Sequence, residues 1–113
     1  MPKRNKLLQA PPFPVEHCLR DLGNRLRTAR IRRNLTIADA AERIGTGARA
    51  VMDAEKGKPA TGMVVYAALL WLYDQLEQLD EVGDPSRDTE GSALDATRAR
   101  RRARRVQGLD NDF

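Results

Sequence analysis

Residues 35–58 read LTIADAAERIGTGARAVMDAEKGK, and this stretch decides the fold because it predicts two short helices joined by a tight turn. Thr36 is a favourable N-cap, and Asp39 three residues later completes a shortened capping box. Apolar residues at helical spacing predict the first helix over Ile37–Ile44 and the second over Ala48–Lys56. The Gly-Thr-Gly sequence between them stops the first helix and forms the turn.

Helices are also predicted on both sides of this pair. In front of it, apolar residues three and four apart predict a helix over residues 15–33, with Pro14 placed to open it and Asn34 to end it. Behind it, Thr61 is the expected cap of an apolar helix that runs through Tyr73, and a fifth helix follows. No strand pattern is visible, so the sequence predicts an all-α fold with five helices.

The folded domain is predicted to span residues 15–83, with a segment of different composition at each end. Residues 1–14 contain four of the six prolines, which indicates an extended N-terminal arm. A Gly-Asp-Pro-Ser turn cluster begins at residue 83 and is expected to end the domain. Residues 84–113 form a basic C-terminal tail that is predicted to be partly helical or disordered. Its arginine run is either solvated or a surface for a partner.

The net charge of +4 hides an uneven distribution of charge along the chain. Residues 1–33 hold nine Lys or Arg and two acidic residues, whereas residues 59–83 hold four acidic residues and no Lys or Arg. The basic segment 1–33 and the acidic segment 59–83 suggest two partners of opposite charge, one of them polyanionic. The alternative is that these charges only solvate the surface.

The composition excludes several classes of function. One cysteine and one histidine in 113 residues leave no disulfide framework and no Cys/His zinc site. The chain has no GxGxxG or GxxxxGK(S/T) phosphate loop, and no nucleophile is placed to act with its lone histidine, so neither an enzyme nor a cofactor is expected. Aromatic residues make up 4%, which argues against base stacking with single strands. No run of membrane-spanning length and no signal peptide are visible, so we expect a soluble cytoplasmic protein without a membrane partner.

A few short motifs are arranged as in a known family. They are Leu22–Arg27, Arg30, Leu35–Thr36, Ala41, Ile44–Gly45 and Glu55–Gly57. With them the chain resembles the Xre/Cro/cI-type helix-turn-helix family across about residues 19–73. The resemblance implies a five-helix, lambda-repressor-like domain that binds double-stranded DNA as a homodimer at an inverted-repeat operator. It also implies a structural ion pair between Arg30 and Glu55.

Later motifs are similar to those of the HipB-like antitoxins. They comprise Tyr66 with Leu69–Trp71, then Leu76, the Asp84–Gly91 segment and the final basic run Arg104–Val106. This similarity implies an antitoxin that represses its own operon and binds a HipA-like kinase toxin. The tail arginines would then contact either DNA or this protein partner.

The candidate site residues follow from the resemblance to the helix-turn-helix family. On the second helix of the pair, Arg49 alone is placed and long enough to reach a base, and guanine is its natural target. Asp53 would repel phosphate unless it accepts a hydrogen bond from a cytosine amino group. The predicted DNA contacts are Thr36, Thr46, Gly47, Ala48, Arg49, Asp53, Lys56 and Lys58. The predicted dimer interface is Tyr66, Leu69, Trp71, Leu72, Leu76 and Leu79.

The sequence departs from the family where bases would be read. Ile37 stands where many members have glutamine, and Gly47 where many have a serine cap. Ala48 and Ala50 replace longer polar side chains. These departures leave an alternative open: a degenerate helix-turn-helix that acts only as a protein-interaction module and sequesters a partner. Salt-dependent binding to DNA would separate the two hypotheses.

Overall fold

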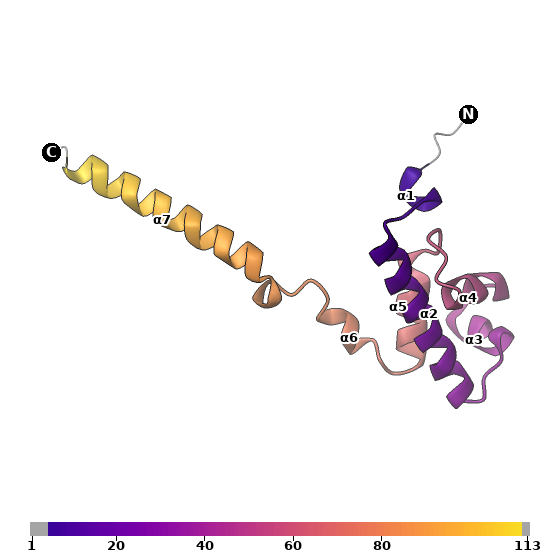
Figure 1. The fold of residues 1–113 in the computed structure, drawn as a ribbon. Helices are drawn as coiled ribbons and strands as arrows, with labels where there is room; N and C mark the ends of the chain where they lie inside the picture. The colour runs from indigo at the N-terminus through magenta and orange to yellow at the C-terminus, as the bar shows by residue number, and fades with distance from the viewer. Residues whose placement is uncertain (1–4, 112–113) are drawn as a thin grey trace. The chain divides into compact units, whose positions relative to one another are not determined.

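The computed structural model describes residues 5–111, and every regular element in this range is helical (Figure 1). In chain order these are α1 (Lys6–Gln9), α2 (Phe13–Arg32), α3 (Ile37–Ile44), α4 (Ala48–Glu55), α5 (Met63–Leu72), α6 (Glu77–Asp80), a 3₁₀ turn (Pro85–Arg87) and α7 (Thr89–Asn111). The predicted all-α class is confirmed. None of these helices is long and apolar enough to cross a membrane. The chain divides into two compact units, one ending at Asp80 and one beginning at Glu81.

The boundaries of α3 and α4 are set by capping chemistry. Thr36 Oγ1 accepts from the Asp39 N–H and the Asp39 carboxylate accepts from the Thr36 N–H, each at 3.0 Å, which completes the predicted capping box. The bond from the Thr36 N–H lowers the pKa of Asp39, so the box persists at neutral pH and is lost only as the pH falls through that lowered value. Gly45 ends α3 with a left-handed φ of 81°. α4 has no side-chain cap at Gly47 and ends at Glu55, one residue earlier than predicted.

Two glycines allow the backbones of α2 and α4 to approach closely. A Cβ at Gly23 would lie 2.5 Å from the carbonyl oxygen of Glu55 and 2.6 Å from that of Ala54. Gly57, just after α4, has a φ of 67°, and a Cβ there would lie 2.6 Å from the backbone of Leu19. A larger residue at either position would therefore push α2 away from α4.

The core of the first unit lies between α2, α3, α4 and α5. Its largest fully buried side chains are Val51, Leu69 and Tyr73, and alanines at facing positions let the helices pack closely. Arg33 donates to the Tyr73 carbonyl oxygen at 3.0 Å and to that of Ala29 at 2.9 Å, and its guanidinium lies 5.4 Å from the centre of the Tyr73 ring. These contacts tie the end of α2 to the end of α5.

The N-terminal boundary differs from the prediction. The expected extended arm contains a helical turn, α1, which begins where the Asn5 side chain accepts from the Leu7 N–H at 3.0 Å. α2 begins at Phe13, two residues earlier than predicted, with Pro12 as its N-cap residue. Pro14 lies inside the first turn, where its missing N–H costs nothing because the helix supplies no acceptor there. Residues 1–4 of the predicted arm lie outside the described residues.

The two helices after α4 are shorter than predicted. α5 begins at Met63 behind Gly62, so Thr61 is not its N-cap. Asp74 follows α5 with a left-handed φ of 60°, which separates α5 from the apolar stripe that predicted the fifth helix. The fifth predicted helix is reduced to the single turn α6, and Val82 lies outside it with 72% of its surface exposed.

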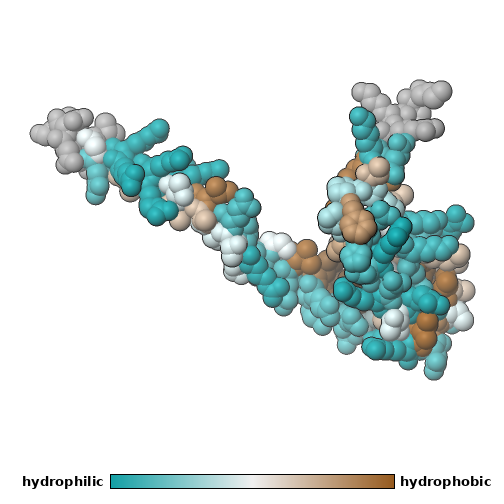
Figure 2. All heavy atoms as spheres, in the orientation of Figure 1, coloured by the Kyte–Doolittle hydropathy of each residue, from teal (hydrophilic) through white to brown (hydrophobic). Residues whose placement is uncertain are grey.

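The second unit consists of the 3₁₀ turn and α7. Asp84 accepts from the Ser86 N–H and Asp88 from the Gly91 N–H, both at 2.9 Å, so side chains cap the start of each element. α7 comprises 23 residues of the tail that was expected to be partly helical or disordered. No side chain described between residues 89 and 108 is buried, and Figure 2 shows α7 as mostly hydrophilic.

Candidate nucleic-acid interface

The turn between α3 and α4 is exposed, together with the first turn of α4. Thr46, Gly47 and Ala48 are all exposed, and 79% of the Arg49 side chain is exposed. Because Gly47 provides no side-chain cap, the first N–H groups of α4 present the positive end of the helix to solvent. Such a helix end is suited to a phosphate group. Thr36, at the start of α3, is exposed as well.

Asp53 lies between two of the predicted cationic contacts. Its Oδ1 atom is 3.5 Å from Arg49 Nε and 3.2 Å from Lys58 Nζ. The two cations offset the carboxylate charge that was expected to repel phosphate. An ion pair between helix residues four apart contributes about 0.3–0.5 kcal/mol, whereas a bidentate contact with guanine contributes about 1–3 kcal/mol. Arg49 can therefore leave Asp53 for a base at a net gain.

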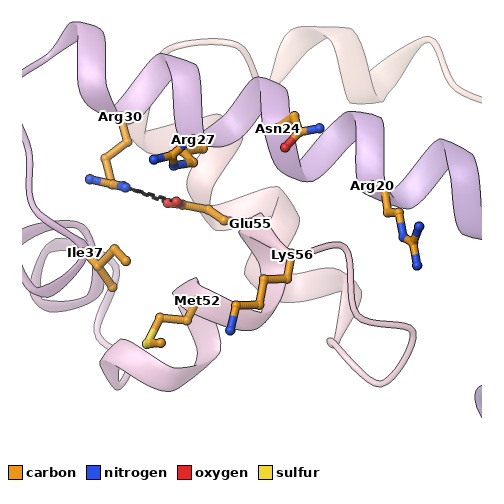
Figure 3. A pocket seen from close by; sticks show the side chains of 8 residues that line it. All are labelled: Arg20, Asn24, Arg27, Arg30, Ile37, Met52, Glu55 and Lys56. Carbon is orange, nitrogen blue, oxygen red and sulfur yellow. Dashed lines mark hydrogen bonds and ion pairs between the residues drawn. The ribbon is translucent and has the colours of Figure 1, made fainter.

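A cationic hollow of about 460 Å³ lies beside α4 (Figure 3). Its lining residues come from α2, α3 and the end of α4, and they are Arg20, Asn24, Arg27, Arg30, Ile37, Met52, Glu55 and Lys56. Lys56 is the predicted phosphate contact among them. Arg27 forms no ion pair among the described residues, and Arg20 pairs with the exposed Glu16 at 2.7 Å. The hollow therefore offers cationic side chains to an anion.

Arg30 and Glu55 form a buried, bidentate ion pair at this hollow (Figure 3). Arg30 Nε donates to Glu55 Oε2 at 2.7 Å, and Nη2 donates to Oε1 at 3.0 Å. Arg30 Nη1 also donates to the Leu35 carbonyl oxygen at 2.8 Å. The bond to Glu55 raises the pKa of Arg30 above its ordinary value. One guanidinium thus joins α2, the segment before α3, and the end of α4, and so fixes the orientation of α4.

The predicted dimer interface needs correction. Tyr66 and Leu69 are 3% and 0% exposed in a single chain, because they face the core that α5 shares with α3 and α4. They are therefore not available to a second copy. Leu72, Leu76 and Leu79 are partly buried, and Trp71 is 61% exposed. Val64, two turns before Trp71 on the same side of α5, is 76% exposed and was not predicted.

Three polar residues of the cationic hollow, Arg20, Asn24 and Arg27, were not among the predicted site residues. Asn24 and Arg27 precede Arg30 by six and three residues and line the same hollow. Residues three and four apart share one face of a helix, so the spacing from Arg30 was the signal that pointed to them.

One comparison with known proteins agrees with this geometry. A family model described as a helix-turn-helix domain matches residues 21–81, which is more than half of the chain. The matched range begins within α2 and ends just after α6, so it includes the whole of α3 and α4. No curated protein and no solved structure matches the chain.

Proposed function

The chain belongs to the helix-turn-helix domain family, and we propose that it is a sequence-specific DNA-binding regulator of transcription that acts in the cytoplasm. The observation that carries the proposal is the exposed start of α4, with Arg49 beside an uncapped helix end and the cationic hollow next to the same helix. α4 is then the recognition helix that enters the major groove.

In this mechanism, one residue of α4 reads a base and neighbouring residues contact phosphates. Arg49 reads a guanine through its two parallel donors. Thr36, Thr46, Lys56 and Lys58 contact phosphates, which position the protein without reading sequence. The Arg30–Glu55 pair touches no base and holds α4 at its angle to α2.

The proposal includes a homodimer that binds an inverted repeat. The exposed apolar face of α5, formed by Val64 and Trp71, supports this arrangement because soluble monomers seldom expose large apolar patches. A two-fold dimer brings the same patch of each protomer together, so α5 would pack against α5 of a second copy.

Trp71→Glu is expected to give monomers, because it places a charge on this apolar face. Analytical ultracentrifugation measures the mass at protein concentrations of roughly tens of micromolar, which exceed the dissociation constant of an ordinary dimer. Ile31→Glu is the matched control: Ile31 is 49% exposed on α2, and its replacement is expected to leave the dimer intact. An unmodified protein that sediments as a monomer contradicts the proposed dimer.

Selection from a random duplex library tests the DNA-binding proposal. The full chain is expected to enrich an inverted repeat whose half-sites are about one helical turn apart. Binding is expected to weaken steeply as salt rises. The absence of both enrichment and salt-dependent binding would overturn the proposal in favour of the protein-interaction module.

The finer proposal is that the protein is the antitoxin of a HipA-like kinase toxin and represses its own operon. It rests on the sequence resemblance alone, from Tyr66 to the basic run that ends at Val106. A kinase-like reading frame adjacent to the gene, whose product forms a complex with this chain, is the observation that tests it.

A further inference from the structure

The most concentrated charge in the protein lies on α7, outside the helix-turn-helix unit. Six arginines fall within residues 98–105, and no acidic residue occurs between residues 96 and 108. They are Arg98, Arg100, Arg101, Arg102, Arg104 and Arg105, and all six are exposed. None of them forms an ion pair among the described residues. The helix therefore carries a block of positive charge that nothing described in the chain neutralises.

The spacing of these charges resembles that of the phosphates in DNA. Eight helical residues rise about 12 Å, so six arginines give one positive charge per roughly 2 Å. Double-stranded DNA carries one negative charge per about 1.7 Å of its axis. Arginines four residues apart, such as Arg98 and Arg102, also repel each other and disfavour the free helix. A polyanion of matching charge density removes that repulsion.

The arginines cover a broad arc of the helix rather than a narrow stripe. At about 100° per residue they span roughly 200° of the circumference, from Arg100 through Arg101 to Arg102. Four of them, Arg98, Arg101, Arg102 and Arg105, line a hollow of about 170 Å³. An arc this wide suits a groove with phosphates on both walls, and the major groove, about 12 Å wide, admits one α-helix. The remaining face carries Ala96, Ala99, Ala103 and Val106.

Two other polyanionic surfaces fit α7 less well. A helix that lies on a membrane needs large apolar side chains opposite its cations, whereas the opposite face of α7 is mostly alanine. Single-stranded nucleic acid is bound through aromatic stacking, and residues 89–108 contain no aromatic side chain. Double-stranded DNA requires only the phosphate contacts that arginine provides.

We propose that α7 is a second DNA-binding element, whose arginines bind the phosphates of a DNA duplex of any sequence. This function is additional to sequence reading by α4 and does not depend on it. Arg98, Arg101, Arg102 and Arg105 form the centre of the contact, because they surround the hollow.

The test compares full-length chains that differ only in charge. One variant replaces Arg98, Arg101, Arg102 and Arg105 with Gln, which forms helices about as well as Arg. The matched control replaces Lys6, Arg25, Arg32 and Arg43, four exposed cations of the first unit, with Gln. A third variant places Lys at the same four α7 positions. Fluorescence anisotropy with a random-sequence duplex of about three helical turns is recorded over a series of salt concentrations.

A plot of log affinity against log salt concentration has a negative slope. In the α7 glutamine variant this slope is expected to become less steep by about 0.9 for each lost phosphate contact, or by about 3–4 in all. Its affinity for random duplex is expected to fall at least tenfold, while the lysine variant and the matched control keep slopes near that of the unmodified chain. Circular dichroism checks that α7 remains helical in all variants. A glutamine variant with the unmodified slope overturns the proposal and points instead to an acidic protein partner for α7.

The outcomes also separate this proposal from sequence reading by α4. If α4 reads no sequence, the unmodified chain still binds random duplex and the α7 glutamine variant loses nearly all of that binding. If α7 does not touch DNA, a selected sequence is still preferred over random duplex and the salt slope does not change.

Discussion

Glu55→Ala is expected to destabilise the helix-turn-helix unit by about 3–5 kcal/mol, because it leaves the buried Arg30 guanidinium without its partner. Arg30 and Glu55 are 9% and 8% exposed and share two hydrogen bonds, of 2.7 and 3.0 Å. Urea denaturation, followed by circular dichroism, measures the change in the free energy of unfolding. A loss of this size is a large part of the stability of an ordinary small domain.

An exposed pair of the same length provides the control. Arg20 and Glu16 are also 2.7 Å apart, but their side chains are 66% and 37% exposed. Glu16→Ala is expected to cost less than about 1 kcal/mol, because water already screens that pair. The two variants remove the same kind of contact, so the difference between them measures the effect of burial.

A double-mutant cycle isolates the coupling between Arg30 and Glu55. Each single alanine variant strands one buried charge, whereas the double variant strands none. The double variant is therefore expected to be more stable than the sum of the single losses predicts, by about 0.5–3 kcal/mol. Additive losses would mean that the two side chains do not stabilise each other, contrary to the geometry described above.

The helix-turn-helix segment was predictable because local chemistry sets its boundaries. Thr36 and Asp39 satisfy each other's backbone N–H groups, and Gly45 supplies the left-handed end of α3. These preferences act within a few residues and need no tertiary structure. The same holds for Asn34, whose φ of 54° places it in the left-handed region after α2, as predicted.

Apolar character alone was a weaker guide beyond that segment. α5 is apolar on nearly every side, so its sequence does not distinguish a face that meets the protein's own core from a face left for a second copy. Tyr66 and Leu69 are buried in the core, whereas Val64 and Trp71 are exposed to solvent. Only the placement of α5 against α3 and α4 separates them.

In the candidate site, one contact of Asp53 could be predicted from the spacing along the helix, and the other could not. Asp53 follows Arg49 by four residues, so the sequence places both on one face of α4. Its second contact, with Lys58, depends on the left-handed turn at Gly57 and was not foreseen. The sequence left Asp53 either to repel phosphate or to accept a hydrogen bond from a cytosine amino group, and it did not reveal the two cations that hold its charge in the structure.

Arg49→Ala is expected to remove sequence discrimination while leaving general attraction to DNA largely unchanged. A bidentate contact with guanine is worth about 1–3 kcal/mol, so the variant is expected to bind the selected sequence about 5–150-fold more weakly. Random duplex carries no guanine at a fixed position, and its affinity is expected to fall by much less. Anisotropy titrations of the two duplexes at one salt concentration give the ratio directly.

Two further variants test the chemical basis of this discrimination. Arg49→Lys keeps the positive charge but lacks the planar pair of donors, so it is expected to lose discrimination as Arg49→Ala does while retaining affinity for random duplex. Asp53→Asn removes the carboxylate that holds Arg49 and Lys58, so it is expected to raise affinity for both duplexes. If Arg49→Ala weakens binding to both duplexes equally, Arg49 is a phosphate contact, and α4 reads no guanine through it.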